Sequence, residues 1–318
     1  MVDKKVISIK QINYALAVAK YLHFKKAAEA SNVSQSAMST AIHEMEKQLG
    51  FQVFERNNKQ VLLTYQGELF ITKAQAVKLA LDELHQISEL TTTALSAPMK
   101  LGVIPTIGPY LLPKVLPQVR ANYPLFKLHL VEDQSHVLVD MVRHGDLDAA
   151  ILALPFPIEG LMAFDFWAED FYLISHRDEY PGYPKEIASN ELELDRLMLL
   201  KDGHCLKEQA LAACQMQQEE QGQEFSATSL NTLIQMVAGK VGSTLVPEMA
   251  LEQLLKGHSE LRAIHLNEPG PHRRIAIIIR PNYVRVTDIE VLKKMFADSL
   301  QQHSASRKAK AINPLQLA

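Results

Sequence analysis

The feature that most constrains the fold is a series of short apolar segments after residue 98. These segments are MKLGVIP, FKLHLVED, LDAAILAL, FYLISH, LMLL, GSTLVP and RIAIIIRP, and stretches with helical character separate them. Short apolar runs that alternate with helical stretches predict buried, parallel strands with helices packed on the sheet. We therefore expect an α/β fold for the larger, C-terminal part of the chain.

Length and composition limit the class of protein. A chain of 318 residues corresponds to about two domains, and a hydrophobic content of 47% is enough for a substantial core. No apolar run reaches the length of about 18 residues that spans a membrane. The N-terminus lacks the apolar run and cleavage site of a secretory signal. The only two cysteines do not make a disulfide framework, so we expect a cytoplasmic protein.

Charge is distributed unevenly along the chain. Residues 1–66 hold nine Lys/Arg and five Asp/Glu, a net charge of +4, whereas the whole chain carries −3 and the remainder therefore −7. A basic module on an acidic body indicates that the N-terminal part meets a polyanion. A chance excess of lysines is the alternative reading.

Two short helices joined by a tight turn are predicted near the N-terminus. The first covers residues 25–30, and the second begins after Ser34 as N-cap and ends near Leu49, before Gly50. This is a helix-turn-helix pattern. The second helix opens with side chains suited to contact phosphates and base edges, or simply to be solvated: Ser34, Gln35, Ser36, Ser39 and Thr40.

The segments that follow extend this module. FQVFERNNKQVLLTYQG predicts a strand, a polar turn and a second strand, and Arg56 near the turn is placed to meet backbone phosphates. Residues 67–95 then predict one long helix with a mostly apolar stripe. A helix of this length outside a compact core needs a partner for its stripe, either a second chain or its own body.

Both cysteines lie in the segment DGHCLKEQALAAC. We expect Asp202 to cap a helix whose first turn holds Cys205, because good helix formers follow. The free amides and dipole of a helix N-terminus favour a thiolate, which predicts a lowered pKa for Cys205. A thiolate is the form that attacks a peroxide.

The spacing of the two cysteines excludes a disulfide in an intact helix. Nine residues of helix separate the Cα atoms of Cys205 and Cys214 by about 13 Å on opposite faces, whereas a disulfide needs Cα atoms within about 7 Å. Oxidation would have to unwind the segment, so the arrangement suits a redox switch. Two small apolar residues buried in a helix are the alternative reading.

The N-terminal pattern resembles the LysR-type transcriptional regulators. The match runs through FKKAAEASNVSQSAMSTAIHEMEKQLGFQVFERNNKQVLLTYQGELF, although Thr40 and His43 stand where family members often carry arginine. The resemblance implies a winged helix-turn-helix, a linker helix that pairs with a second chain, and a two-lobed regulatory domain like a periplasmic binding protein. The implied boundaries are 1–66 for DNA binding, 67–95 for the linker helix and 98–306 for regulation, with lobe I at about 98–168 and 275–303 and lobe II at about 169–274.

Within this family, four segments resemble the OxyR group of peroxide sensors. They are LLKDGHCLKEQALAACQ, IPTIGPYLLP, ATSLNTLIQMVAGKVGSTLVP and HRRIAIIIRP. The resemblance implies that Cys205 is the peroxidatic thiol, which forms a sulfenic acid, and that Cys214 resolves it as a disulfide. It also implies neighbours that hold the peroxide or stabilise the thiolate: Thr106, His204, Arg274 and Glu208, the last standing where relatives often have aspartate.

The implied function is a hydrogen peroxide-sensing transcriptional regulator of antioxidant genes, not a turnover enzyme and without cofactor or metal. The implied partners are double-stranded promoter DNA, a second or further copies of the chain, RNA polymerase and a thiol reductant of the glutaredoxin or thioredoxin type. Two alternatives stay open: a LysR-type regulator of another small effector, and a thiol peroxidase carrying a DNA-binding module.

Overall fold

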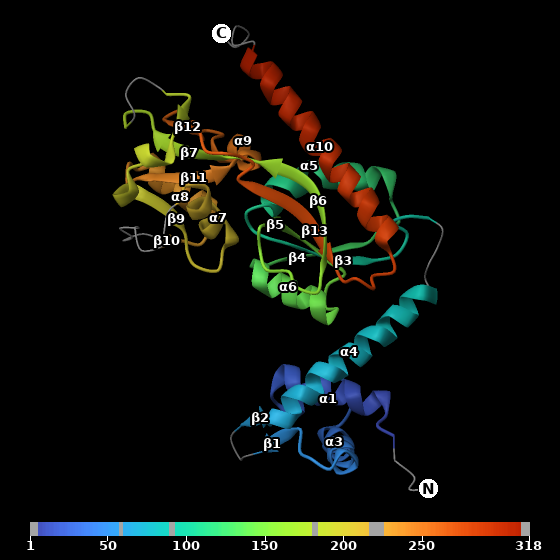
Figure 1. Cartoon of the computed structure of the whole chain (residues 1–318). Helices are drawn as coiled ribbons and strands as arrows, with labels where there is room; N and C mark the ends of the chain where they lie inside the picture. Colours follow the sequence, from blue (N-terminus) through green and yellow to red (C-terminus); the bar gives the residue numbers. More distant parts are fainter. Residues whose placement is uncertain (1–5, 57–59, 89–92, 180–183, 216–225, 313–318) are drawn as a thin grey trace. The chain divides into compact units, whose positions relative to one another are not determined.

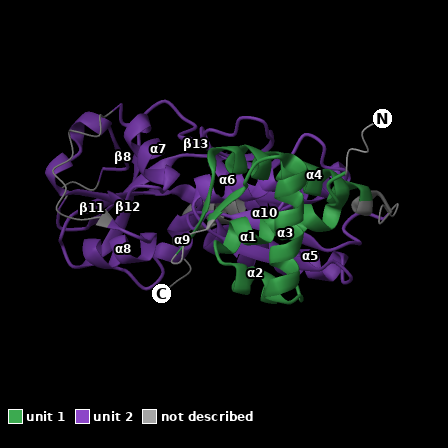
Figure 2. Ribbon diagram, turned by 90° about the horizontal axis from the view of Figure 1, so that it is seen from below, with its two compact units in different colours: residues 1–90 green, residues 91–318 purple. Residues whose placement is uncertain are grey.

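The computed structural model describes residues 6–56, 60–88, 93–179, 184–215 and 226–312 (Figure 1). The chain divides into two compact units, Met1–Leu90 and Thr91–Ala318, which are coloured separately in Figure 2. Each unit has its own hydrophobic core. No described helix is both long and apolar enough to cross a membrane.

The first unit is a winged helix-turn-helix followed by a long helix. Its elements are α1 (Ile9–Tyr21), α2 (Phe24–Ala30), α3 (Gln35–Leu49), β1 (Phe54–Arg56), β2 (Val61–Leu63) and α4 (Tyr65–Ser88). The Ser34 hydroxyl caps α3 by accepting a hydrogen bond from the Ala37 amide at 3.2 Å. Gly50 ends α3 with a positive φ of 79°. The predicted helix-turn-helix is therefore confirmed, with both of its α3 boundary signals in place.

The wing is anchored to α3 by a buried carboxylate. β1 and β2 pair antiparallel, and Glu46 of α3 accepts hydrogen bonds from the amides of Val53 at 2.9 Å and Phe54 at 3.1 Å. A Cβ atom at Gly67 would collide with the Val53 carbonyl, so only glycine lets α4 start this close to the wing. The predicted turn at residues 57–59 lies outside the described residues.

The linker helix does not extend to residue 95, the end of the expected range. We expected a helix over 67–95, and α4 is described from Tyr65 to Ser88. Leu95 is not helical: its φ is +55°, and its amide donates to the Asp288 carboxylate at 2.8 Å. Arg285 ion-pairs with the same carboxylate and donates to the carbonyls of Ala97 and Pro98. These contacts tie the start of the second unit to its last helix, and they end any helical continuation there.

Lobe I of the second unit is a five-stranded sheet in the order β4-β3-β5-β13-β6. Its strands are β3 (Met99–Val103), β4 (Leu128–Glu132), β5 (Ala149–Leu154), β6 (Met162–Glu169) and β13 (Arg273–Ile279). β3 pairs parallel with β4 and β5, whereas β13 pairs antiparallel with β5 and β6. Helices α5 (Gly108–Asn122) and α10 (Val286–Ile312) pack together on one side of the sheet, and α6 (Ser135–His144) lies on the other (Figure 1).

Lobe II is a six-stranded sheet in the order β10-β9-β11-β7-β12-β8. Its strands are β7 (Phe171–His176), β8 (Glu186–Ile187), β9 (Leu197–Leu200), β10 (Ser226–Ala227), β11 (Ser243–Pro247) and β12 (Leu261–Leu266). Its helices are α7 (Cys205–Ala213), α8 (Leu230–Ala238) and α9 (Leu251–Leu254), with 3-10 turns at Ser189–Glu191, Leu194–Arg196 and Glu248–Ala250.

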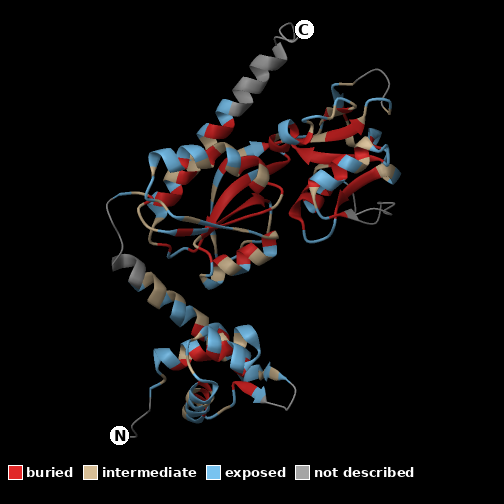
Figure 3. Ribbon diagram, turned by 180° about the vertical axis from the view of Figure 1, so that it is seen from behind, coloured by how far each residue is buried: buried red, intermediate tan, exposed pale blue. Residues whose placement is uncertain are grey.

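The chain crosses between the two lobes twice. It leaves β6 at Glu169 for β7, and it returns from β12 at Leu266 to β13. The central strands of both sheets are largely buried (Figure 3), and one hydrophobic core runs through both lobes. This is the predicted α/β, two-lobed architecture, and the fold class is confirmed. The finer residue boundaries of the lobes stay a prediction.

The lysine-rich segment from residue 304 is helical, because α10 continues to Ile312. Alanine, lysine and arginine in this segment are good helix formers, and no proline occurs in it before position 314. Residues 313–318 lie outside the described part.

Candidate functional site

The two cysteines lie at opposite ends of one intact helix. Cys205 is the first residue of α7 and Cys214 its C-cap, and both are free and buried. The residue at the N-cap position is His204, not the expected Asp202, and its side chain makes no capping hydrogen bond. The Asp202 carboxylate instead forms an ion pair with the Lys207 ammonium at 2.7 Å. This ion pair links the residues on either side of Cys205.

Cys205 borders a small cavity where the two lobes meet. The cavity is narrow: its empty space is about 170 Å³ with the part that opens to solvent included, and no part of it holds a water-sized molecule. The residues that line it follow β3 and β4 in lobe I, or lie at the start of α7 and in the turn before it. They are Ile104, Pro105, Thr106, Gln134, Ser135, Gly203, His204 and Cys205. Gly203 has a φ of +93°, and a Cβ atom there would meet the Gln134 side chain. The structure thus brings Cys205, His204 and Thr106 together, as the sequence resemblance implied.

Sequence reasoning missed Ser135. This residue begins α6 and is 1% exposed. Its hydroxyl lies beside Cys205 at the cavity and lowers the pKa of that thiol, and it has no hydrogen-bond partner among the described residues. No local pattern marks one serine at a helix start as functional, because its neighbour is 70 positions away in the sequence.

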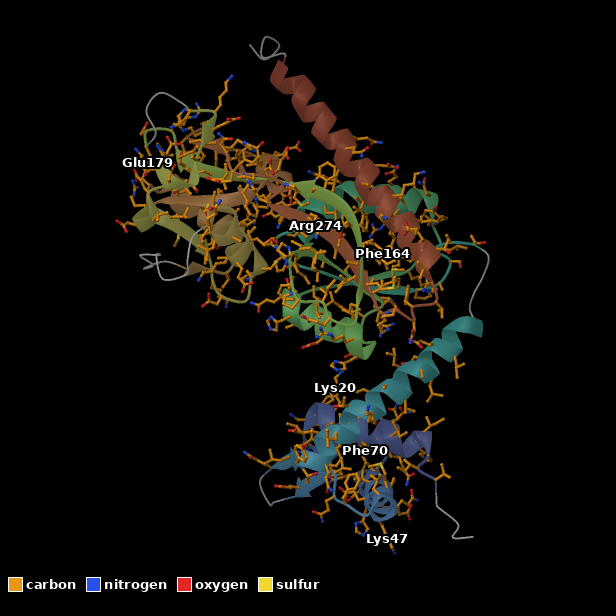
Figure 4. All side chains as sticks on the ribbon, in the orientation of Figure 1. Lys20, Lys47, Phe70, Phe164, Glu179 and Arg274 are labelled. Carbon is orange, nitrogen blue, oxygen red and sulfur yellow. The ribbon has the colours of Figure 1, made fainter. Side chains whose placement is uncertain are left out.

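The cation beside the cavity is Arg273, not Arg274. Successive residues of a strand point to opposite faces, and on β13 it is Arg273 that points inward, at 1% exposure. Its guanidinium donates to the Thr106 hydroxyl at 3.3 Å and to the Thr106 carbonyl at 3.4 Å. The Arg274 side chain, labelled in Figure 4, is 54% exposed and pairs with Asp165. The predicted role of Arg274 is therefore corrected.

Glu208 does not stabilise a thiolate. It is exposed on α7, and its negative charge raises the pKa of the Cys205 thiol. A carboxylate disfavours a second negative charge nearby, so it raises the pKa of a neighbouring thiol. The expected favourable role of Glu208 is therefore also corrected.

The pKa of Cys205 is raised, which contradicts the expectation from its position at a helix start. Burial is the main cause, and the nearby Ser135 hydroxyl and the Arg273 charge oppose it. Burial also raises the pKa of Cys214 to about 12, with a contribution from Glu268. His204 has a lowered pKa, mainly through burial and then through Lys201, and so is neutral near pH 7. The resting site thus holds thiols next to a neutral imidazole.

The side chains predicted to meet DNA gather on the first half of α3. Met38 and Ile42 of α3 are buried in the core of the first unit. The predicted residues lie toward solvent, four of them exposed and Ser39 half-buried: Ser34, Gln35, Ser36, Ser39 and Thr40. The Arg56 side chain lies outside the described part. Among the described residues, no cluster of His, Cys, Asp and Glu is arranged to hold a metal.

Two family models match this chain. Residues 9–68 match the bacterial regulatory helix-turn-helix protein of the lysR family, and residues 93–301 match the LysR substrate binding domain. The chain belongs to the LysR family of transcriptional regulators. The family resemblance read from the N-terminal sequence is confirmed.

Several curated relatives cover nearly the whole of this LysR regulator. It is 35% identical over 286 residues to the HTH-type transcriptional regulator EstR of Acinetobacter baylyi, covering 90% of this chain and 94% of that protein. It is 34% identical over 278 residues to the DNA-binding transcriptional dual regulator OxyR of Escherichia coli, covering 86% and 90%. A hydrogen peroxide-inducible genes activator of Dickeya chrysanthemi is 33% identical, covering 93% and 96%.

Solved structures show the same likeness. A full-length OxyR of Pseudomonas aeruginosa, in which one cysteine is replaced by aspartate, superimposes with a TM-score of 0.74 at 31% identity, covering 92% of this chain and 95% of that one. A hydrogen peroxide-bound OxyR of Corynebacterium glutamicum, in which one cysteine is replaced by serine, gives a TM-score of 0.65 at 28% identity, covering 97% of both chains. The resemblance to the OxyR group is therefore confirmed.

Proposed function

We propose that this LysR regulator senses hydrogen peroxide through Cys205 and converts oxidation into a change of promoter binding. The observation that carries the proposal is the small cavity at the lobe contact, in which Cys205 meets the Thr106 hydroxyl and, from α6, the Ser135 hydroxyl. Relatives named hydrogen peroxide-inducible genes activators support it.

The narrow space beside Cys205 favours peroxide over a larger effector, because no part of it holds a water-sized molecule in the resting structure. A small opening would admit peroxide, whereas drug-sized ligands generally need pockets of about 300–1,000 Å³. Two hydroxyls and a neutral imidazole provide hydrogen bonds for a molecule with two oxygens. Thr106 is held in place by Arg273, so one of the two hydroxyls is oriented before peroxide arrives.

The first chemical step is oxidation of one thiol. Cys205 loses its proton, and its sulfur attacks one peroxide oxygen while the O–O bond breaks. One oxygen stays as the sulfenic acid of Cys205, and the other leaves as water with the proton. The positive charge of Arg273 favours the thiolate that attacks.

The second step requires α7 to unwind. Cys205 and Cys214 are separated by the length of α7, about 13 Å between Cα atoms in an ideal helix. Once the helix opens, the Cys214 sulfur attacks the Cys205 sulfenic sulfur, a disulfide forms and water leaves. A dithiol reductant of the glutaredoxin or thioredoxin type then returns both thiols and is itself oxidised to a disulfide.

The output is a change in how an oligomer holds promoter DNA. The linker helix α4 carries exposed apolar side chains at Leu69, Val77 and Leu84, and pairing with a second chain would bury them. The α3 helices of a dimer read adjacent half-sites. Dimer or tetramer assembly, contact with RNA polymerase, control of antioxidant genes and a cytoplasmic location complete the proposal.

Promoter occupancy in cells tests this function. Chromatin immunoprecipitation of the wild-type chain, before and after a brief peroxide dose, should show occupied promoters whose footprint and transcription change. Cys205→Ser should bind the same promoters without the change. A peroxide response that survives Cys205→Ser would refute the proposal.

A second candidate function is regulation by another small effector, because the similar protein EstR is named a transcriptional regulator and not a peroxide-inducible activator. This function predicts that transcription responds to the effector and does not depend on the redox state of the thiols. A thiol peroxidase would instead consume many equivalents of peroxide per chain in the presence of a thiol reductant, and consumption of about one equivalent per reduction cycle would exclude it.

A further inference from the structure

A buried glutamine joins α7 to lobe I. Gln209 lies one turn after Cys205 and is 3% exposed. Its Nε2 atom donates to the Ala153 carbonyl at 3.1 Å and to the Pro155 carbonyl at 3.3 Å, both at the end of β5. These two bonds therefore cross from the redox helix of lobe II to the sheet of lobe I.

Gln209 and Cys205 share one face of the helix. Residues four apart lie above one another on an α-helix, so the two side chains both point toward the end of β5. The backbone of Ala153 also lies near the Cys205 sulfur and lowers the pKa of that thiol. The amide thus holds the turn of α7 that carries the reactive sulfur.

Packing alone does not account for a glutamine at this position. Its Oε1 atom is buried and has no hydrogen-bond partner among the described residues. Burying an unpaired amide oxygen is unfavourable, and an apolar side chain of the same length would avoid that cost. The contribution of Gln209 therefore comes from the two hydrogen bonds that its Nε2 atom donates.

We infer that Gln209 is a positioning residue that latches α7 in its helical, reduced form and so sets how readily the disulfide forms. The inference rests on the proposed Cys205–Cys214 switch. Both latch bonds require α7 to be helical and docked on β5, whereas the disulfide requires the same helix to open. Their energy therefore stabilises the dithiol form and not the disulfide form.

The test is the redox equilibrium of a Gln209→Met variant. Methionine has the same length but no donor. The full-length wild type and variant are equilibrated with mixtures of reduced and oxidised dithiothreitol, in which one disulfide forms for each one reduced. Mass spectrometry then counts the fraction of each chain with the Cys205–Cys214 bond. Ala212→Met, on the exposed face of α7, is the matched control.

We expect the equilibrium constant of Gln209→Met to favour the disulfide about tenfold more than wild type, which is about 30 mV toward more negative potential. Ala212→Met should remain within twofold of wild type. Equal potentials for Gln209→Met and wild type would overturn the inference.

Two further measurements separate the possible failures. Amide hydrogen exchange of α7 in the reduced protein should accelerate about tenfold in Gln209→Met and not in Ala212→Met, whether or not a disulfide forms. If the wild type forms no disulfide, only the proposed switch is refuted. If amide hydrogen exchange of α7 is unchanged in Gln209→Met, the latch is refuted. If Gln209→Met does not fold, Gln209→Asn, whose shorter amide cannot span the same gap, provides the same comparison.

Discussion

Arg273 Nη2 lies 2.7 Å from Glu169 Oε1, and both side chains are fully buried. Glu169 ends β6 and Arg273 begins β13, so this ion pair joins the two places where the chain passes between lobes. Glu169 also accepts a hydrogen bond from the Met249 amide at 2.7 Å, and Arg273 reaches Thr106 at the cavity. Burial raises the pKa of Glu169, and the Arg273 charge and the Met249 amide oppose that rise.

Removing Arg273 should therefore destabilise the regulatory domain strongly. Arg273→Met leaves Glu169 buried without its counter-ion, which costs about 3–5 kcal/mol in comparable pairs. Arg274→Met on the same strand removes only an exposed pair with Asp165, worth at most about 1 kcal/mol. Urea unfolding of the two variants measures both free energies, and equal losses would contradict the assignment of Arg273.

Thr106 should affect the reaction more than the fold. Thr106→Val keeps the shape of the side chain but removes the hydroxyl at the cavity, and we expect sulfenic acid formation at Cys205 to slow about tenfold, the value of one hydrogen bond in the transition state. The control is Thr244→Val in lobe II, because the Thr244 hydroxyl is buried without a hydrogen-bond partner among the described residues. That variant should react at the wild-type rate; slowing in both variants would indicate a general loss of structure.

The reaction with peroxide should accelerate steadily with pH. The attacking species is the thiolate, and burial holds the pKa of Cys205 above its reference value of 9.0. Because a raised thiol pKa keeps the thiolate fraction small at neutral pH, the rate should rise with each unit of pH between 7 and 9, by up to about tenfold per unit and without a plateau. Stopped-flow kinetics of the Cys214→Ser variant measure this profile, and a plateau below pH 8 would show that the resting thiol is more acidic than the structure implies.

The exposed stripe of α4 predicts an oligomerisation variant. The Leu84 side chain is 63% exposed, and a second chain that covers it would not tolerate a charge. Leu84→Glu should lower the association constant of the dimer at least tenfold, as measured by light scattering or sedimentation. Leu62→Glu, in the wing and 43% exposed, should leave assembly unchanged, and an unaltered Leu84→Glu oligomer would place the interface elsewhere.

Local sequence signals were reliable where burial is uniform or a cap is required. β5 and β13 are apolar along almost their whole length and were predicted as strands, while Ser34 and Gly50 marked the ends of α3. The same uniformity hid the orientation of the adjacent arginines. In an alternating strand the pattern would have shown that Arg273 faces inward, but β13 is buried on both faces.

The remaining site errors arise from contacts distant in sequence. Ser135 lies beside Cys205 only because lobe I and lobe II meet at this point, where α6 and α7 begin. No spacing in the sequence predicts that contact. The raised pKa of Cys205 was missed for a similar reason: its position at a helix start was predictable, but the burial that outweighs it depends on the packing of the folded chain. Long-range packing decided these features.

The thiol state after a near-stoichiometric dose of hydrogen peroxide tests the central claim most directly. Mass spectrometry of the wild type should show one intramolecular bond between Cys205 and Cys214, and Cys214→Ser should accumulate a sulfenic acid at Cys205, trapped by dimedone. If both thiols stay reduced under that dose, the redox switch is contradicted, and the regulator must respond to a different molecule.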